Sequence, residues 1–430
     1  MHNSRSYVKQ DKIINNFETT KSIKMDRSIK NIETQLLNKV PQVTLFFWII
    51  KVLCTTVGET FADFLNVNLG FGLTGTSITM GVLLAISLFF QCRAKKYIPA
   101  IYWITVVFIS VFGTLVTDNL TDKMGIQLET STIIFSILLL LTFCLWYINE
   151  KTLSIHSIFT QKREVFYWLT ILFTFALGTA SGDLMAEGLG LGYLNTGLIV
   201  AAIILFFIIA QKLKLNSVLS FWFIYIMTRP LGASIGDYLS QPAKFGGLGL
   251  GATLTSVIFL VGILAIILYF TFTKRDVITN LDLDEMPTNE DKGLVVQGLI
   301  TVALFIIVGF SAYHWRQSQL QIEIVQPLIS NQTGNVNLPV STLGDLSDFK
   351  KITQDTKDLV VSKNMDGAKN RISDLEHEWD IAQVKLKTMD NKKWKEVDDA
   401  IDKVLRQLRA VNPVQKDCET SLIDLLKVLD

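Results

Sequence analysis

One stretch of the sequence recurs four times, and no other feature constrains the fold as strongly. In each copy a tryptophan is followed ten residues later by a glycine, and five residues after that by an aspartate. The anchors are Trp48/Gly58/Asp63, Trp103/Gly113/Asp118, Trp168/Gly178/Asp183 and Trp222/Gly232/Asp237. Each copy lies in a long apolar segment, and a second apolar segment follows it. Self-similarity at a fixed period indicates a repeat architecture, so we expect a two-helix unit repeated four times.

The composition indicates that these helices lie in a membrane. Of the 430 residues, 50% are hydrophobic and 18% are charged, and the mean hydropathy is +0.38. A soluble domain carries more charge, and an apolar run of roughly 20 residues is long enough to span a bilayer as a helix. Nine spans are predicted, at about 43–65, 71–91, 98–120, 131–149, 165–186, 193–210, 218–239, 251–272 and 294–313. The predicted fold class is an all-α polytopic membrane protein.

The predicted domain boundaries follow these spans. The four-repeat transmembrane domain covers residues 41–273, with repeats at 41–92, 97–149, 164–211 and 218–273. The remaining parts are a polar tail (1–40), a loop (274–293), a ninth transmembrane helix (294–313), a polar linker (314–344) and a C-terminal domain (345–430).

The C-terminal domain shows the pattern of soluble amphipathic helices. Apolar residues recur every three or four positions, as in Ile372, Leu375 and Trp379, which predicts a small three- or four-helix bundle outside the membrane. We interpret its acidic run, Glu376, Glu378 and Asp380, as a solvated face rather than a metal site.

Basic residues are distributed unevenly between the two sets of loops. Eleven lysines and arginines lie in the loops between repeats, and two lie in the loops within repeats. By the positive-inside rule, the inter-repeat loops and the N-terminus are cytoplasmic. The tryptophans are then expected at the inner interface of the membrane and the repeat aspartates toward the outer side. The C-terminal bundle is expected to be extracytoplasmic.

Small residues form one face of each repeat helix. Each repeat glycine is followed four positions later by a second small residue. The pairs are Gly58/Ala62, Gly113/Thr117, Gly178/Gly182 and Gly232/Gly236. This small-xxx-small spacing lets helix backbones approach closely in lipid, so we interpret the tryptophans and glycines of the repeats as structural.

A second face of each repeat helix is polar. Positions seven, eleven and fifteen after the tryptophan stack along one side of a helix. They hold Thr55, Glu59 and Asp63, then Ser110, Thr114 and Asp118, then Phe175, Thr179 and Asp183, then Arg229, Ala233 and Asp237. Lys51 lies on the same face of the first helix, four residues before Thr55. Charged residues inside membrane segments usually face a bundle interior or a watery cavity.

These residues are the candidate site for transport or binding of an ion. The set comprises Glu59, Asp63, Asp118, Asp183, Asp237, Lys51, Arg229, Thr55, Thr114 and Thr179. An alternative is that the four aspartates only terminate helices at the lipid headgroups. That alternative does not account for Glu59, Lys51 and Arg229, which lie deeper in the membrane.

Arg229 needs a partner, because an uncompensated guanidinium near the middle of a membrane is costly. Four parallel repeats in a closed ring place the fourth copy beside the first. We therefore predict that Arg229 pairs with Glu59, with Asp63 as the second choice, and that Lys51 serves the same carboxylate from below.

Glycine-rich loops follow the aspartate in three repeats, at 68–77, 188–197 and 246–256, whereas the second repeat has the different sequence MGIQLETSTI at 124–133. Such loops either present backbone groups to an ion or make tight connections between helices, and the second interpretation is the more common one.

The repeats, together with the segments KVPQVTLFFWIIKVLCTTVGE (39–59) and TRPLGASIGD (228–237), resemble a bacterial family of integral membrane proteins. Its members consist of four tandem two-helix repeats, each with a characteristic tryptophan, and the resemblance covers roughly residues 39–273. The C-terminal part is similar to a helical domain attached to such proteins. The resemblance implies the architecture and a location in the bacterial inner membrane, and it implies no activity.

Three functions are weighed against these observations. The first is a transporter or channel for a small ion, most plausibly a cation, and the second is a membrane scaffold or sensor whose external bundle binds a partner or ligand. An intramembrane enzyme is disfavoured, because no Ser–His pair or HExxH motif is present and no span holds a histidine.

No cofactor and no nucleic acid is expected, lipid is the expected surrounding, and no metal is assigned. The four cysteines, Cys54, Cys92, Cys144 and Cys418, have no metal-ligand spacing.

Overall fold

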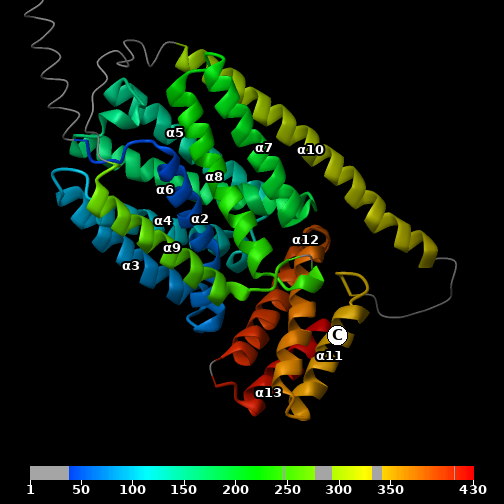
Figure 1. Cartoon of the computed structure of the whole chain (residues 1–430). Helices are drawn as coiled ribbons and strands as arrows, with labels where there is room; N and C mark the ends of the chain where they lie inside the picture. The colour runs from blue at the N-terminus through cyan, green and yellow to red at the C-terminus, as the bar shows by residue number, and fades with distance from the viewer. Residues whose placement is uncertain (1–37, 246, 277–292, 332–340, 411) are drawn as a thin grey trace, which may run out of the picture.

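The protein is described by a computed structural model in residues 38–245, 247–276, 293–331, 341–410 and 412–430 (Figure 1). Within these ranges, nine helices are long and apolar enough to cross a membrane, which confirms the predicted class. Most of the predicted tail (1–40), most of the loop (274–293) and part of the linker (314–344) lie outside the described residues.

Each repeat consists of a first helix that carries the tryptophan, glycine and aspartate, and of a second helix. The first helices are α2 (Leu45–Asp63), α4 (Pro99–Asp118), α6 (Gln161–Asp183) and α8 (Ser217–Ser240). The second helices are α3 (Gly72–Arg93), α5 (Leu128–Glu150), α7 (Gly192–Lys212) and α9 (Gly251–Thr273). Short 3-10 turns, η3 (Ile155–Ser157) and η5 (Ala243–Phe245), lie in two of the loops.

Local sequence signals fix where the first helices begin. The side chains of Thr44, Thr160 and Asn216 each accept a hydrogen bond from a backbone N–H of the first turn of α2, α6 and α8. Pro99 is the first residue of α4, where the missing N–H has no intrahelical partner in any case. The four first helices start three to seven residues before their tryptophans.

The first helices form a closed inner ring in which α2 contacts α4, α4 contacts α6, α6 contacts α8, and α8 contacts α2. Each second helix packs mainly on the first helix of the next repeat: α3 on α4, α5 on α6, α7 on α8, and α9 on α2. Accordingly, 56–67% of the apolar window of each first helix is buried, against 17–28% for each second helix. The contact of α9 with α2 closes the ring, so the first and fourth repeats are neighbours.

Irregular turns follow the aspartate in the first three repeats. The π-helical turns η1 (Phe64–Asn68), η2 (Asn119–Lys123) and η4 (Leu184–Gly188) begin directly after Asp63, Asp118 and Asp183. The glycine-rich loops then turn sharply, as at Gly190 and Gly192, which both have φ near +70°. These φ values favour glycine, so the loops are tight connections between helices. The second repeat has only Gly125 in such a conformation, which accounts for its different sequence.

The ninth span belongs to a helix that is longer than expected. Helix α10 runs from Leu294 to Asn331, so the predicted linker, which was to begin at residue 314, is wrong in its first part. Residues 314–321 are polar but contain no glycine or proline, and polarity ends a membrane span without ending a helix. Arg316 of this extension donates through Nε to the carbonyl of Gly188 at 3.2 Å.

The C-terminal domain is the expected helical bundle. It consists of α11 (Ser347–Val361), α12 (Met365–Arg409) and α13 (Gln415–Leu429), and α12 is divided by a kink at Asp390. The apolar positions predicted to form its core, including Leu375, Trp379 and Trp394, are buried in one cluster. Within the acidic run, Glu376 is half-buried and forms an ion pair with Arg409, whereas Glu378 and Asp380 are exposed.

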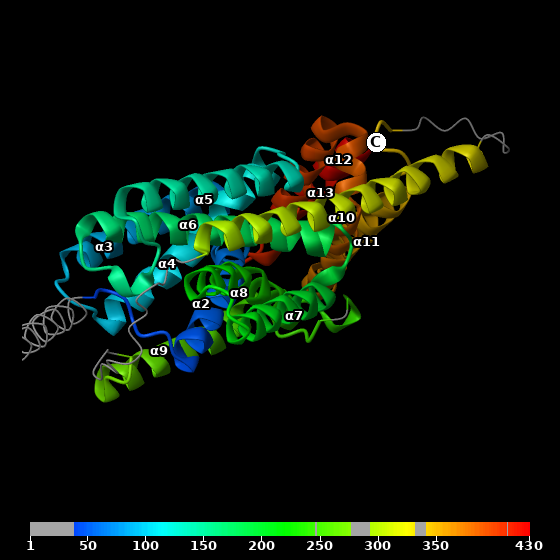
Figure 2. The ribbon, with the colours of Figure 1, turned by 90° about the horizontal axis from the view of Figure 1, so that it is seen from above.

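The two ends of the ring differ in what covers them. The C-terminal bundle (α11–α13) stands against the end of the ring where the first helices finish, called here the aspartate end (Figures 1 and 2). The chain enters at the opposite end, called here the tryptophan end, where Lys39 donates its backbone N–H to the carbonyl of Ile158. The polar face of the repeats runs between these two ends.

Candidate functional site

The repeat glycines bring the first helices into backbone contact. A methyl group added at Gly58 would lie 2.0 Å from Ser110 Oγ, and one at Gly232 would lie 2.0 Å from Thr55 Oγ1. Gly113 faces Phe175 and Gly178 faces Arg229 in the same way. Each glycine therefore packs against the residue that lies seven positions after the tryptophan of the next repeat around the ring.

This packing places Arg229 where all four repeats meet. Its side chain is 1% exposed. It donates through Nε to Thr179 Oγ1 at 3.1 Å, through Nη1 to the carbonyl of Thr55 at 2.9 Å, and through Nη2 to Thr114 Oγ1 and to Glu59 Oε2. The expected ion pair between Arg229 and Glu59 is thus present in the structure. The guanidinium is compensated by one carboxylate and three neutral oxygens, which hold it in a fixed orientation.

Lys51 does not join this cluster, contrary to expectation. Its ammonium nitrogen lies 3.6 Å from the ring centroid of Phe175 and 4.2 Å from that of Tyr225. No ion pair or hydrogen bond of Lys51 occurs within the described ranges. The aromatic faces supply the electrostatic compensation that Glu59 was expected to provide, and Glu59 is already engaged by Arg229.

The four repeat aspartates lie together around the aspartate end. Asp63 is exposed and Asp118, Asp183 and Asp237 are half-buried. Each lies within electrostatic reach of Glu59, and no side-chain hydrogen bond reaches them from the residues that the structure describes. The result is a rim of carboxyl groups, without an ion pair among the described residues, around one end of the ring and above the Arg229 pair.

Two acidic residues that we did not single out belong to the same rim. Asp122 and Glu187 lie one turn beyond Asp118 and Asp183, in the turns η2 and η4. Asp122 is within electrostatic reach of Asp118, and Glu187 is within reach of Asp183. Continuing the spacing of four by one more step would have found both of them.

The tryptophans pack inside the ring rather than facing lipid, and their depth relative to the membrane interface stays a prediction. Trp103, Trp168 and Trp222 are buried, and Trp48 is half-buried. The aromatic residue before each tryptophan packs on the tryptophan of the next repeat. The ring centroids lie 5.5 Å apart in Phe47–Trp103, 5.5 Å in Tyr102–Trp168, 6.3 Å in Tyr167–Trp222 and 5.5 Å in Phe221–Trp48. These contacts bury the indoles and fill the tryptophan end of the ring.

A buried ion pair lies beneath this aromatic layer. Lys39 Nζ lies 2.6 Å from Glu164 Oε2, and both side chains are almost fully buried. Lys39 also donates to the carbonyl of Cys92 at 3.1 Å, and Gln91 donates to Glu164 at 3.4 Å. The tryptophan end therefore holds a paired, buried charge, whereas the aspartate end is lined by carboxyl groups without an ion pair among the described residues. Lys39 had been assigned to the polar tail, and nothing in its sequence context signals this contact.

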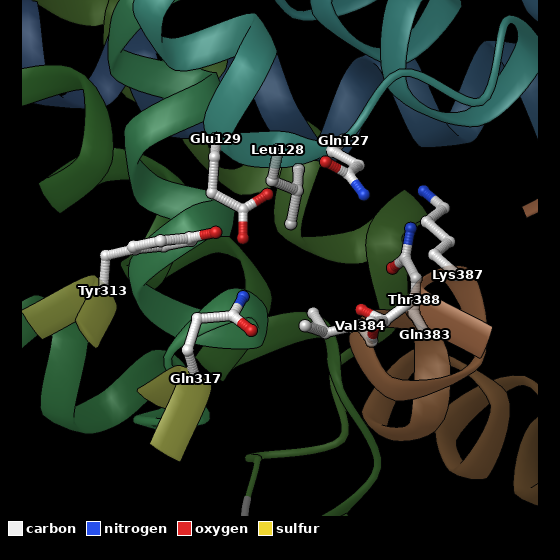
Figure 3. A pocket seen from close by; sticks show the side chains of 9 residues that line it. All are labelled: Gln127, Leu128, Glu129, Tyr313, Gln317, Gln383, Val384, Lys387 and Thr388. Carbon is white, nitrogen blue, oxygen red and sulfur yellow. The ribbon is translucent and has the colours of Figure 1, made fainter. Parts of the chain in front are cut away.

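A polar cavity of about 160 Å³ lies between the start of α5, the extension of α10 and α12 (Figure 3). Side chains from the three helices converge on it, among them Glu129, Gln317 and Lys387. A space of this size accommodates several water molecules or a very small polar ligand. It lies beside the rim rather than on the axis of the ring.

Comparison with known families identifies the repeats. Residues 46–97, 101–152, 166–214 and 220–276 each match the family described as Repeat of Unknown Function (DUF347). The chain belongs to this repeat family. Each matched DUF347 segment contains one first helix and one second helix, so the sequence repeat and the structural repeat coincide. None of the curated proteins and none of the solved structures matches the chain.

Proposed function

We propose that this DUF347 protein is a transporter or channel for a small ion, with a cation favoured. The observation that carries the proposal is the rim of four carboxyl groups, Asp63, Asp118, Asp183 and Asp237, around one end of a closed helix ring. A mouth lined by one sign of charge concentrates counter-ions, and carboxylates concentrate cations. We also propose that the protein has no enzymatic activity.

The Arg229–Glu59 pair gives an entering cation a point inside the ring where it can bind. A cation that passes the rim meets Glu59, the deepest carboxylate of the polar face, and competes there with the guanidinium of Arg229. Below this point Lys51 and the aromatic layer oppose further passage. Movement at the tryptophan end is therefore needed for release, which favours a transporter with alternating access over an open channel.

Ion flux into liposomes tests this function. The purified protein is reconstituted and assayed with dyes for H⁺, Na⁺, K⁺, Mg²⁺ and Mn²⁺. Flux of at least one cation is expected, and Asp118→Asn combined with Asp183→Asn is expected to lower it by roughly tenfold, the order by which a charged mouth raises local ion concentration. The matched control is Asp417→Asn, an exposed carboxylate of α13. Absence of flux for every cation, or an equal effect of the control, would contradict the proposal.

The alternative is a membrane scaffold or sensor whose C-terminal bundle binds a partner or ligand. The cavity between α5, α10 and α12 favours a sensor, because a ligand there would touch the membrane ring and the bundle together. Normal ion flux after deletion of residues 345–430, with loss of a cellular phenotype, would favour this alternative.

For the cellular location, we propose a multi-pass protein of the bacterial inner membrane with its tryptophan end in the cytoplasm. A reporter fused after Asp430 is then expected to behave as extracytoplasmic. Cys418 is buried in the bundle core, so a cysteine at the exposed position of Lys416 is the better target for an impermeant thiol reagent in spheroplasts. A cytoplasmic fusion together with an unreactive cysteine would contradict this orientation.

A further inference from the structure

Helix α12 of the C-terminal bundle touches all four repeats at the aspartate end. It contacts η1, η2 and η4, the turns that follow the aspartates of the first three repeats. In the fourth repeat Lys244, in the loop after α8, forms an ion pair with Asp374 of α12 and donates to the carbonyl of Asn370 at 3.2 Å. The bundle therefore stands over the mouth of the ring and not beside it.

The second repeat provides most of the anchoring hydrogen bonds, all of which end on backbone carbonyls. Asn391 Nδ2 donates to Gly125 at 2.9 Å, Lys395 Nζ donates to Asp122 at 3.1 Å, and Lys387 Nζ donates to Thr121 at 3.3 Å. Lys387 is buried against the ring of Trp394, with its ammonium nitrogen 3.9 Å from the centroid. The anchors hold α12 in one orientation on the rim.

Acidic side chains of the two parts nevertheless face each other. Asp63 lies within electrostatic reach of Glu376, and Asp122 lies within reach of Asp398 and Asp402. Burial, and then the charge of Asp122, raise the pKa of Asp398 to about 8. A carboxyl group whose pKa is raised in this way is disfavoured in its charged form, so burying it in the docked contact is costly. The docked arrangement is therefore held by polar anchors, and by Arg409, Lys387 and Lys395 near the rim carboxyl groups, against the cost of burying acidic side chains.

No apolar cluster joins the bundle to the ring within the described residues. The core of the bundle, from Leu343 to Leu429, is separate from the cores of the membrane helices. Polar interfaces between domains of one chain permit relative motion by default, whereas large apolar interfaces do not. The contact has the composition expected of one that opens and closes.

We propose that the C-terminal bundle is a reversible lid that closes the aspartate end of the ring. This inference rests on the proposed ion transport, because a lid over the rim controls whether a cation reaches Glu59. When α12 leaves the rim, the acidic side chains of both parts return to bulk solvent and the burial cost is relieved.

A disulfide across the docked contact tests the lid. A Cβ atom at position 125 would lie 3.5 Å from Nδ2 and Oδ1 of Asn391, so the two positions are neighbours across the contact, and Gly125→Cys with Asn391→Cys is the pair to test for disulfide formation. The pair is introduced into the full chain after replacement of the native cysteines, reconstituted in liposomes, and assayed with the same cation dyes. We expect flux to stop on oxidation and to return on reduction, while each single variant is insensitive to both treatments. Equal flux in the oxidised and reduced double variant would overturn the lid.

Position 125 has φ +68°, so a cysteine there is strained, and a second pair covers a failure to fold. Lys244→Cys and Asp374→Cys are joined by a short bifunctional thiol reagent that contains a disulfide, so that flux is expected to stop when the link forms and to return when it is reduced. Hydrogen exchange of residues 119–127 supplies a readout that needs no flux. Exchange is expected to rise when Lys387, Asn391 and Lys395 are replaced by alanine, and not for the control Lys403→Ala on the same helix. If neither the wild-type protein nor any variant carries ions, the transport proposal fails. The hydrogen-exchange measurement then decides alone whether the bundle leaves the rim.

Discussion

Replacing Glu59 by glutamine is expected to destabilise the protein by about 3–5 kcal/mol, because the change leaves the buried guanidinium of Arg229 without its carboxylate. Arg229→Gln is expected to have an effect of similar size, since it removes the donor to Glu59, Thr114 and Thr179 together. The double variant should recover part of the loss, because neither charge then remains uncompensated. Chemical or thermal unfolding of the purified protein in detergent measures all three effects.

The control for this cycle is the exposed pair Lys403–Asp424 on the surface of the bundle. Removing either partner there should change stability little, because solvent screens exposed ion pairs. A second cycle with Asp63→Asn in place of Glu59→Gln should be additive with Arg229→Gln, since Asp63 makes no ion pair within the described residues. Strict additivity of the Glu59 and Arg229 changes would show that the contact contributes no coupling energy.

The pairing of Arg229 with Glu59 was predictable because both residues follow the same spacing of four on the polar face of their repeats. The spacing of four assigns each residue to a face, and the number of repeats places the fourth copy beside the first. Lys51 satisfied the same rule and was assigned wrongly. The surroundings of Lys51 depend on the side chains that α6 and α8 present to it, and these are Phe175 and Tyr225. A helical wheel of one segment contains no information about the residues that face it.

The packing of the tryptophans could not be predicted for a related reason. An indole prefers the membrane interface when its alternative is lipid, but here each one packs on the aromatic residue before the tryptophan of the preceding repeat. The pattern Phe/Tyr–Trp was visible in all four copies, and its meaning requires the ring. The contact of α12 with the rim had no sequence signal, because Asn391, Lys387 and Lys395 resemble ordinary surface residues of an amphipathic helix.

Replacing Gly232 by leucine is expected to prevent the ring from closing and to abolish most folded protein. Even the first added atom would lie 2.0 Å from Thr55 Oγ1 and 2.9 Å from the backbone nitrogen of Thr56, so α8 and α2 must move apart. That movement also withdraws the carbonyl of Thr55 from Arg229. The matched control is Gly309→Leu in α10, where nothing lies within 4 Å, and there the yield and the melting temperature should be kept. Similar behaviour of the two leucine variants would show that the repeat glycine is not at a helix contact.

An exchange of residues across one contact tests whether close approach is the cause. Gly58→Ala should lower stability by about 1–3 kcal/mol or more, because the new methyl group overlaps Ser110, whose Oγ and Cβ would lie 2.0 Å and 2.9 Å away. Combining it with Ser110→Gly removes both atoms and leaves the backbone carbon of residue 110 at 3.2 Å, so part of the stability should return. Ser110→Gly alone should be mildly destabilising, since glycine is a poor helix former. The same exchange at Gly232 and Thr55 should rescue less, because the nitrogen of Thr56 remains in the way. Equal rescue at both contacts would mean that the side chain of position seven, and not the distance between the two backbones, sets how closely these helices pack.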